Sequence, residues 1–214
     1  MIKHKQIIQG TDEWHAIKWR KIGGTLSKGL FVDSDTLFLK LLGQMLEDVE
    51  FEDSYQNDSM ERGHELEPFA REKLESKLGV KFIETGWLQC EKNYLLGISP
   101  DGITEDETRG CELKCFGRDK HTSIIYNQAI PIENQYQVIH YFTVNDKFKE
   151  VDFYCFRPES IQDYHKIVTL DTGFNLGTKG KPVWKDVGSW VEIAREKAGK
   201  LKCDLETAIE KLSF

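Results

Sequence analysis

The stretch "GISPDGITEDETRGCELKCF", residues 97–116, places two acids and a lysine in a segment whose other residues predict a buried strand. Asp101 stands in a Ser-Pro-Asp-Gly turn, and Glu112 and Lys114 follow after a gap of about ten residues. Residues i and i+2 of a β-strand point to the same face, so Glu112 and Lys114 share one face while the residues beside them, all apolar, share the other. The pattern predicts a half-buried strand with a charged face near its end.

A turn between two paired strands would bring Asp101 beside Glu112. Two carboxylates that converge without a histidine or thiolate ligand set suit a hard cation with oxygen ligands, Mg²⁺ or Mn²⁺. Such ions polarise phosphoryl oxygens, and a neighbouring lysine, here Lys114, stabilises charge that develops on a phosphate. The plain alternative is that Glu112 and Lys114 only form the solvated face of an amphipathic strand, which alternation alone favours.

The composition describes a globular chain of moderate size. Its 214 residues, 39% hydrophobic and 30% charged, suffice for one domain with a sizeable core. A net charge of -7 gives no sign of a general nucleic-acid-binding surface, although a basic patch can be local. We expect no signal peptide and no membrane helix. Five cysteines without CxxC spacing indicate a reduced, cytoplasmic setting.

Apolar spacing predicts helices and strands in alternation. The expected helices are 11–22, 35–48, 60–78 and 132–144, and the last of these fits a helix better than a strand. The expected strands are 80–90 and 93–98 as a hairpin, 109–116 and 149–158, and 47–58 is an acidic surface loop. Pro68 fits only if the regular helix begins just before it, since proline is tolerated in a first turn.

The C-terminal part, about 159–214, is predicted as two helices. Ser189 with Glu192 three residues later forms a capping box, and Asp204 is a candidate cap for the last helix. The order of elements predicts an α/β fold with a mixed central β-sheet flanked by helices, in a single domain over 1–214.

Asp101 with Glu112 and Lys114 resembles the signature of the PD-(D/E)xK nucleases. Further segments are similar to motifs of the phage recombination exonucleases, the lambda-exonuclease-like group: "WHAIKWRKIGGTLS" (14–27), "RGHELEPFAREKLE" (62–75) and "NQYQVIHYFTV" (134–144). All occur in the family's order within about 11–158. The resemblance implies a restriction-endonuclease-like core and an Mg²⁺-dependent deoxyribonuclease, a 5′→3′ exonuclease that acts on linear double-stranded DNA in phage-type recombination.

The resemblance also implies a role for each matched residue. Asp101 and Glu112 would hold Mg²⁺, for which Mn²⁺ would substitute, together with the backbone carbonyl of Leu113. Lys114 would be the catalytic lysine. Glu67 would be a further acid that binds the metal or positions water.

Two of these assignments have alternatives within the sequence. Gln137 would support the lysine or touch the DNA, but the register also allows Gln135. Glu67 could instead be a helix-surface acid that pairs with Arg71 one turn later.

In this family the N-terminal motif helps to bind the 5′-phosphate end of DNA. Amides at a helix N-terminus next to glycines make an anion site, Thr25 and Ser27 can donate hydrogen bonds, and Lys18 and Arg20, ranked equally, can add charge. The family usually has serine where this chain has Thr25.

The resemblance implies partners as well: DNA ends, a single-strand annealing protein, and further copies of the chain in a trimeric ring, in the cytoplasm of a phage's host cell. Two alternatives keep the same signature. One is a restriction-like endonuclease, which would need no 5′-phosphate pocket. The other is a catalytically inactive DNA-end-binding module, against which the complete Asp, Glu and Lys set argues.

Overall fold

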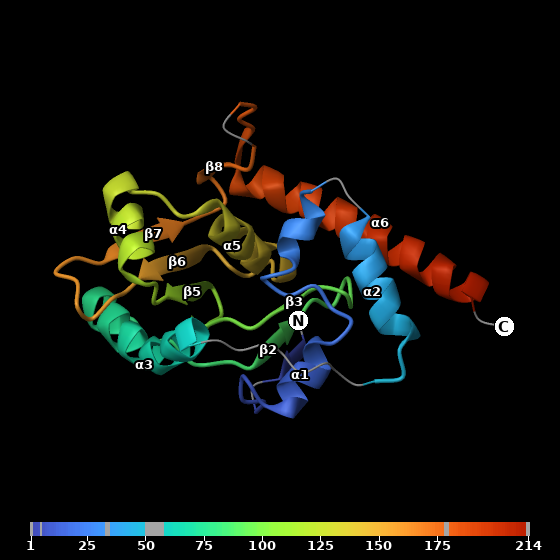
Figure 1. Ribbon diagram of the computed structural model, residues 1–214, viewed down its shortest axis with the longest axis horizontal. Helices are drawn as coiled ribbons and strands as arrows, with labels where there is room; N and C mark the ends of the chain where they lie inside the picture. The colour runs from blue at the N-terminus through green and yellow to red at the C-terminus, as the bar shows by residue number, and fades with distance from the viewer. Residues whose placement is uncertain (1, 5, 33–34, 50–57, 178–179, 213–214) are drawn as a thin grey trace.

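The computed structural model describes residues 2–4, 6–32, 35–49, 58–177 and 180–212. Its elements follow one another along the chain as Figure 1 shows. They are β1 (Ile2–His4), α1 (Asp12–Lys18), the 3-10 helix η1 (Ser27–Leu30), α2 (Thr36–Leu46), α3 (Asp58–Leu78), β2 (Trp87–Gln89), β3 (Gly97–Ile98), β4 (Gly102–Ile103), β5 (Arg109–Lys114), α4 (Arg118–Asn127), α5 (Ile132–Val144), β6 (Glu150–Cys155), β7 (Tyr164–Val168), β8 (Gly173–Asn175), β9 (Trp184–Asp186) and α6 (Val187–Leu212).

A four-stranded mixed sheet forms the centre of the fold. Its strand order is β4-β5-β6-β7, with β5 and β6 parallel and the other pairs antiparallel. The parallel pair needs a crossover connection, which α4 and α5 supply. A three-stranded antiparallel sheet, β1-β2-β3, and the β8–β9 hairpin complete the strands. This mixed sheet with flanking helices confirms the predicted fold class.

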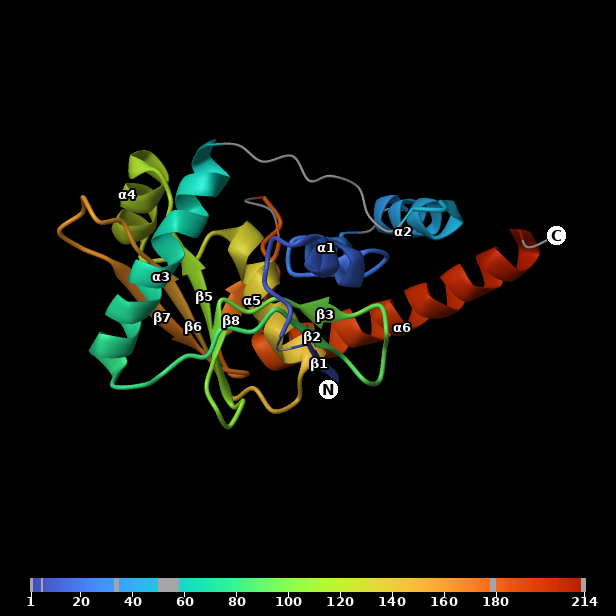
Figure 2. The ribbon, with the colours of Figure 1, turned by 90° about the horizontal axis from the view of Figure 1, so that it is seen from below.

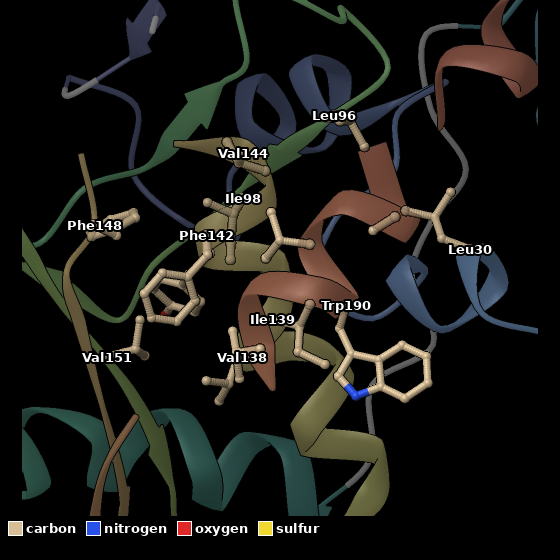
Figure 3. Close-up of a cluster of buried hydrophobic side chains, with 14 of the residues drawn as sticks. Leu30, Leu96, Ile98, Val138, Ile139, Phe142, Val144, Phe148, Val151 and Trp190 are labelled. Carbon is tan, nitrogen blue, oxygen red and sulfur yellow. The ribbon is translucent and has the colours of Figure 1, made fainter. Parts of the chain in front are cut away.

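Helices cover both faces of the central sheet, because alternate residues of β6 belong to different apolar clusters. Tyr154 lies in a small cluster under α3, together with Ala70 and Leu74 of that helix. Val151 and Phe153 lie in the larger core, to which α5 and α6 contribute. Figure 3 shows part of this core, with Ile98, Val138, Ile139, Phe142, Val151 and Trp190 among the labelled side chains. The two cores hold the sheet between them and so fix the ends of its strands.

Most of the predicted elements are present with shorter bounds. The helix predicted over 11–22 ends at Lys18, since Arg20 takes a left-handed conformation with φ 62°. Thr11 caps it, accepting a hydrogen bond from the Trp14 amide at 3.4 Å. The segment 132–144 is helical, as its spacing favours. Of the loop predicted over 47–58, residues 50–57 lie outside the part of the chain that the structure describes.

The prediction for Pro68 is wrong, because α3 begins at Asp58, ten residues earlier. Proline has no N–H, so the bond to the His64 carbonyl is missing from the middle of this helix. Ala70 and Leu74, which follow the proline, are fully buried. Tertiary packing of the second half therefore outweighs the lost hydrogen bond.

The prediction of two C-terminal helices is also wrong. β7, β8 and β9 occupy 164–186, and one helix of 26 residues follows. Asp186 caps this helix in place of Ser189, since its carboxylate accepts the Ser189 N–H at 2.7 Å and the Ser189 hydroxyl at 2.9 Å. Asp204 lies inside α6, where the buried Ala198 and Leu205 on either side of it hold the helix against the core.

The long helix α6 runs along α2 and extends past it (Figure 2). All of its buried residues belong to the large core. Within the described ranges, no helix is long and apolar enough to cross a membrane.

Candidate active site

The turn after β3 and the strand β5 bring Asp101 and Glu112 together. β4 pairs antiparallel with β5, and Asp101 directly precedes β4. Asp101 Oδ2 accepts a hydrogen bond from the Leu113 amide at 2.6 Å, which anchors the turn beside Glu112. Gly102 is required here, because a Cβ at that position would lie 2.7 Å from Phe82 Cβ. The predicted convergence of the two acids is present.

Glu112 is nearly buried and is held from two sides. Its Oε1 lies 2.6 Å from Lys114 Nζ, and its Oε2 accepts a hydrogen bond from the Tyr141 hydroxyl at 2.9 Å. The same hydroxyl lies 2.7 Å from the Cys111 carbonyl. Tyr141 is fully buried in α5, so the helix fixes the orientation of the carboxylate. This contact was not predicted, although Tyr141 lies within the segment 134–144 that is similar to a motif of the family.

Burial and neighbouring charges shift the pKa values of Asp101 and Lys114. Burial raises the pKa of Asp101 well above its usual range, and the nearby Glu112 and Glu67 carboxylates raise it further. Burial alone would lower the pKa of Lys114, but the carboxylates of Glu112 and Asp101 outweigh it and raise this pKa. Lys114 is therefore a cation at neutral pH, and one lysine faces three acids.

This excess of carboxylate fits a hard divalent cation, the group that the resemblance implies. Among the residues that the structure describes, no three His, Cys, Asp or Glu side chains form a complete metal site by themselves. Mg²⁺ commonly takes only one or two carboxylates and fills its other positions with water and substrate oxygens. Asp101 and Glu112 supply such a pair.

α3 brings further groups to the acids. Glu67 lies with Oε1 3.5 Å from His64 Nδ1, and both line the same pocket as Asp101. Arg71 does not pair with Glu67. Its Nε donates to the Asp101 carbonyl at 3.0 Å, and its guanidinium contacts Glu84 at 3.2 Å. α3 thus holds the Asp101 turn in place, a contact with no signal in the sequence.

The acids line a pocket of about 580 Å³. Its lining draws on α1, the glycine pair, α2, α3, β5 and α5. The lining side chains that bear on the chemistry are Trp14, His15, Lys18, Lys21, Thr25, Lys40, Gln44, His64, Glu67, Asp101, Glu112, Lys114 and Gln137. Most of the predicted site residues therefore meet in one place.

The pocket also distinguishes between the two glutamines. Gln137 lines it and lies against Gly24, where an added Cβ would be 3.7 Å from Gln137 Cγ. Gln135 instead donates to the Ile130 carbonyl at 2.7 Å. The register that places Gln137 in the pocket is the one adopted.

Ser27 and Arg20 are not brought to the pocket. Ser27 is fully buried, with its hydroxyl 2.6 Å from the Gly24 carbonyl and 3.1 Å from the Tyr136 carbonyl. The guanidinium of Arg20 donates to the Gln44 carbonyl at 2.8 Å, near the end of α2. The left-handed turn at Arg20 sends its side chain away from the pocket, which residue spacing could not show.

The lining of the same pocket also contains basic side chains. Lys18 Nζ lies 3.2 Å from the centre of a Trp14 ring, and burial lowers the pKa of Lys18 to about 8. Burial also lowers the pKa of Lys21. Lys40 adds a further positive charge from α2. The sequence analysis did not assign Lys40 to the site, since the distance from α2 to the motifs depends on the fold.

An acidic pair and a lysine at the end of two paired strands, over a mixed sheet and beside a helix glutamate, define the PD-(D/E)xK nuclease class. A family model described as the YqaJ-like viral recombinase domain matches residues 13–147, well over half of the chain. The protein belongs to this family.

Two solved structures share the fold over almost the whole chain. One is the alkaline exonuclease LHK-Exo from Laribacter hongkongensis, 22% identical with a TM-score of 0.75, which covers 94% of this chain and 96% of that chain. The other is LHK-Exo in complex with dAMP, 20% identical with a TM-score of 0.72, covering 95% and 98%. No curated protein matches this chain.

Proposed function

We propose that this protein is a metal-dependent DNA exonuclease of phage-type recombination that degrades linear double-stranded DNA. One observation carries the proposal: Asp101, Glu112, Lys114 and Glu67 converge in a pocket that Lys18, Lys21 and Lys40 also line. Such a pocket suits a phosphodiester, because the lysines attract its charge while the acids can hold a metal ion beside it. The family and the fold of an alkaline exonuclease support the assignment.

Different residues of the chain would bind the metal, orient water and stabilise charge during hydrolysis. Asp101 and Glu112, with the Leu113 carbonyl, would hold Mg²⁺ or Mn²⁺, which when bound supplies Lewis-acid stabilisation of the phosphoryl oxygens. Lys114, fixed beside Glu112, orients the attacking water and offsets the charge that develops on the phosphate. Glu67 would bind the metal or position water in the same pocket.

The test compares Asp101→Asn with Glu105→Gln, which alters an exposed acid between β4 and β5. Asp101→Asn should lower the rate of Mg²⁺-dependent degradation of linear duplex by more than about 100-fold. Loss of a direct metal ligand should cost more than loss of a residue that only hydrogen-bonds to a ligand. Glu105→Gln should leave the rate unchanged. Cutting of a covalently closed circle by the unaltered protein would contradict the exonuclease and favour an endonuclease.

We propose a 5′→3′ direction, in which the basic residues of the pocket bind the 5′-phosphate. Thr25 is exposed at the glycine pair, and Lys18 and Lys21 lie beside it in the pocket lining. Gln137, which lines the same pocket and lies against Gly24, would contact the DNA. Thr25 and the two lysines thus support the predicted phosphate site, without Ser27.

Replacing Lys18 by glutamine is expected to reduce the preference for 5′-phosphate over 5′-hydroxyl ends by about tenfold, the loss of one charge-assisted contact of about 1.4 kcal/mol. The preference should also depend on pH. Lys18 has a pKa of about 8, so it is charged below that pH and neutral above it. The terminal phosphate titrates near pH 6 and stays charged throughout this range.

The preference of the unaltered protein should therefore fall between pH 7 and pH 9, while that of Lys18→Gln should be nearly flat. Fluorescence anisotropy with labelled duplexes in EDTA measures both. Lys28→Gln, an exposed neighbour, is the matched control. If the preference of Lys18→Gln for 5′-phosphate ends fell with pH as steeply as that of the unaltered protein, a group other than Lys18 would bind the phosphate.

Replacing Tyr141 by phenylalanine is expected to lower activity about 10- to 100-fold, because the Glu112 carboxylate loses the donor that orients it. The ring remains, so the loss of stability should be only about 1 kcal/mol. Tyr154→Phe is the control, since its hydroxyl donates to Asp163 at 2.8 Å, outside the pocket lining. If both variants lose stability equally but neither loses activity, Tyr141 has no part in the reaction.

We extend the proposal to partners on the strength of the resemblance. A trimeric ring would let a chain with net charge -7 keep its lysines on an inner surface around DNA. A single-strand annealing protein would take up the strand that the exonuclease leaves, in the cytoplasm of the host cell. Sedimentation velocity that gives only a monomer at micromolar concentration would contradict the ring.

A further inference from the structure

The β8–β9 hairpin has features that the active site does not explain. It spans 173–186, outside the residues that the family model matches. It projects from the body of the molecule near the start of α6 (Figure 1). Trp184 in β9 is 69% exposed, whereas the other four tryptophans are buried or half-buried.

The register of the hairpin explains this exposure. Phe174 pairs with Lys185, and the Phe174 side chain is buried in the large core. Trp184 pairs with Asn175, so its side chain lies on the opposite, outer face of the hairpin. Gly173 on that face has no side chain to cover the indole, whose Cε3 would be 4.0 Å from a Cβ there. The hairpin therefore presents an aromatic surface to solvent.

The charge of the hairpin is opposite to that of the chain. Residues 172–185 contain three lysines and no acid, in a protein of net charge -7. Lys181 and Lys185 are exposed, and neither forms a salt bridge with an acid that the structure describes. The adjacent Asp186 is committed to the amide and hydroxyl of Ser189. Lys181 is thus available to a polyanion, whereas Lys185 shares the face of Phe174 and its Nζ lies 5.8 Å from the centre of the Trp190 ring.

We propose that this hairpin binds single-stranded DNA, with a base stacked on Trp184 and a phosphate contacted by Lys181. Exposed aromatic rings flanked by lysines suit unpaired bases, whose faces are open, whereas a duplex hides its base faces. If a second copy of the chain packed here in a symmetric contact, the lysines of the two hairpins would face and repel one another. A polyanion is therefore favoured over a second copy of the chain. The source of the strand, a duplex being degraded, rests on the proposed function, but the binding itself does not.

The test uses the full chain and a fluorescent oligothymidine with a 5′-hydroxyl, in EDTA, so that neither cleavage nor the phosphate site contributes. Trp184→Ala should weaken binding at least about fivefold, the lower end for the loss of one stacked base. Lys181→Gln should reduce the slope of log Kd against log salt by about 0.7, the value for one single-strand phosphate contact.

Matched controls come from the rest of the surface. Tyr126→Ala removes an aromatic ring that is 86% exposed on α4, and Lys77→Gln with Lys211→Gln removes two exposed lysines elsewhere. Neither should change the affinity or the salt slope. All four variants alter exposed side chains, so their melting temperatures should match that of the unaltered protein.

Unchanged affinity in both hairpin variants overturns the proposal. So does a Trp184→Ala protein that sediments differently but binds oligothymidine normally, since the hairpin would then be a contact between copies. A protein that binds through the hairpin but degrades no duplex contradicts the proposed function and leaves this inference standing.

Discussion

Replacing Lys114 by alanine is expected to lower the rate of DNA cleavage by about 1,000-fold, because the reaction loses the one cation that the strand itself supplies to the phosphate. Lys114 Nζ lies 2.6 Å from Glu112 Oε1, and the carboxylates of Glu112 and Asp101 keep the lysine charged. The effect should fall on kcat more than on KM, since the contact strengthens as charge develops on the phosphate.

The variant also leaves Glu112 nearly buried beside Asp101 without its cation. Its melting temperature must therefore be measured alongside its rate, at a temperature where the protein is fully folded. Lys149→Ala, an exposed lysine just before β6, is the control and should cleave normally. Retention of more than a tenth of the activity in folded Lys114→Ala would contradict a catalytic role for this lysine.

Replacing Asp152 by alanine is expected to lower the free energy of unfolding by about 3 kcal/mol, the largest stability effect that we predict. Asp152 is fully buried in β6 and accepts two hydrogen bonds from Arg109, at 2.6 and 2.9 Å. Its Oδ1 also lies 2.7 Å from His165 Nε2. Its removal leaves Arg109 with only the half-exposed Glu150, 3.0 Å away.

This contribution should depend on pH. Burial alone would raise the pKa of Asp152, but the hydrogen bonds from Arg109 and His165 outweigh it and lower this pKa. A carboxyl whose pKa is lowered by folding stabilises the protein above its unfolded value of about 4 and loses that effect as the pH falls through the folded value. The difference between the unaltered protein and Asp152→Ala should therefore be smaller below pH 4 than at neutral pH.

Urea unfolding at a series of pH values measures this difference. Glu150→Ala, which removes the partly exposed partner of the same arginine, should cost less than about 1 kcal/mol. If Asp152→Ala and Glu150→Ala cost the same, the buried network does not hold β5 to β6 in the way that its geometry indicates.

The parts of the site that local pattern dictates were predictable. Strand alternation and a turn suffice to bring Asp101 to Glu112 and Lys114, and helical spacing suffices for α5. Both depend on residues close in sequence, or on one strand pair. The lambda-exonuclease-like resemblance then placed Glu67 and Gln137 in the same pocket, where they lie.

The parts that depend on long-range packing or on one unusual dihedral angle were not predictable. The positive φ of Arg20 turns its side chain to the α2 carbonyls, and the burial of Ser27 commits its hydroxyl to main-chain acceptors. Lys40 reaches the pocket only because α2 folds back over it. At the C-terminus, Ser189 and Glu192 satisfy a capping pattern inside a helix that Asp186, three residues earlier, already caps.

A linear duplex that carries a 5′-phosphate on one strand and a 5′-hydroxyl on the other tests the proposed exonuclease most directly. It is incubated with the protein in Mg²⁺ or in EDTA, beside a covalently closed circle. We expect the phosphorylated strand to be degraded first, mononucleotides to be released, and EDTA to stop the reaction while the circle stays intact. Equal loss of the two strands would contradict the phosphate site, and no loss of any DNA with Mg²⁺ or Mn²⁺ would contradict the nuclease itself.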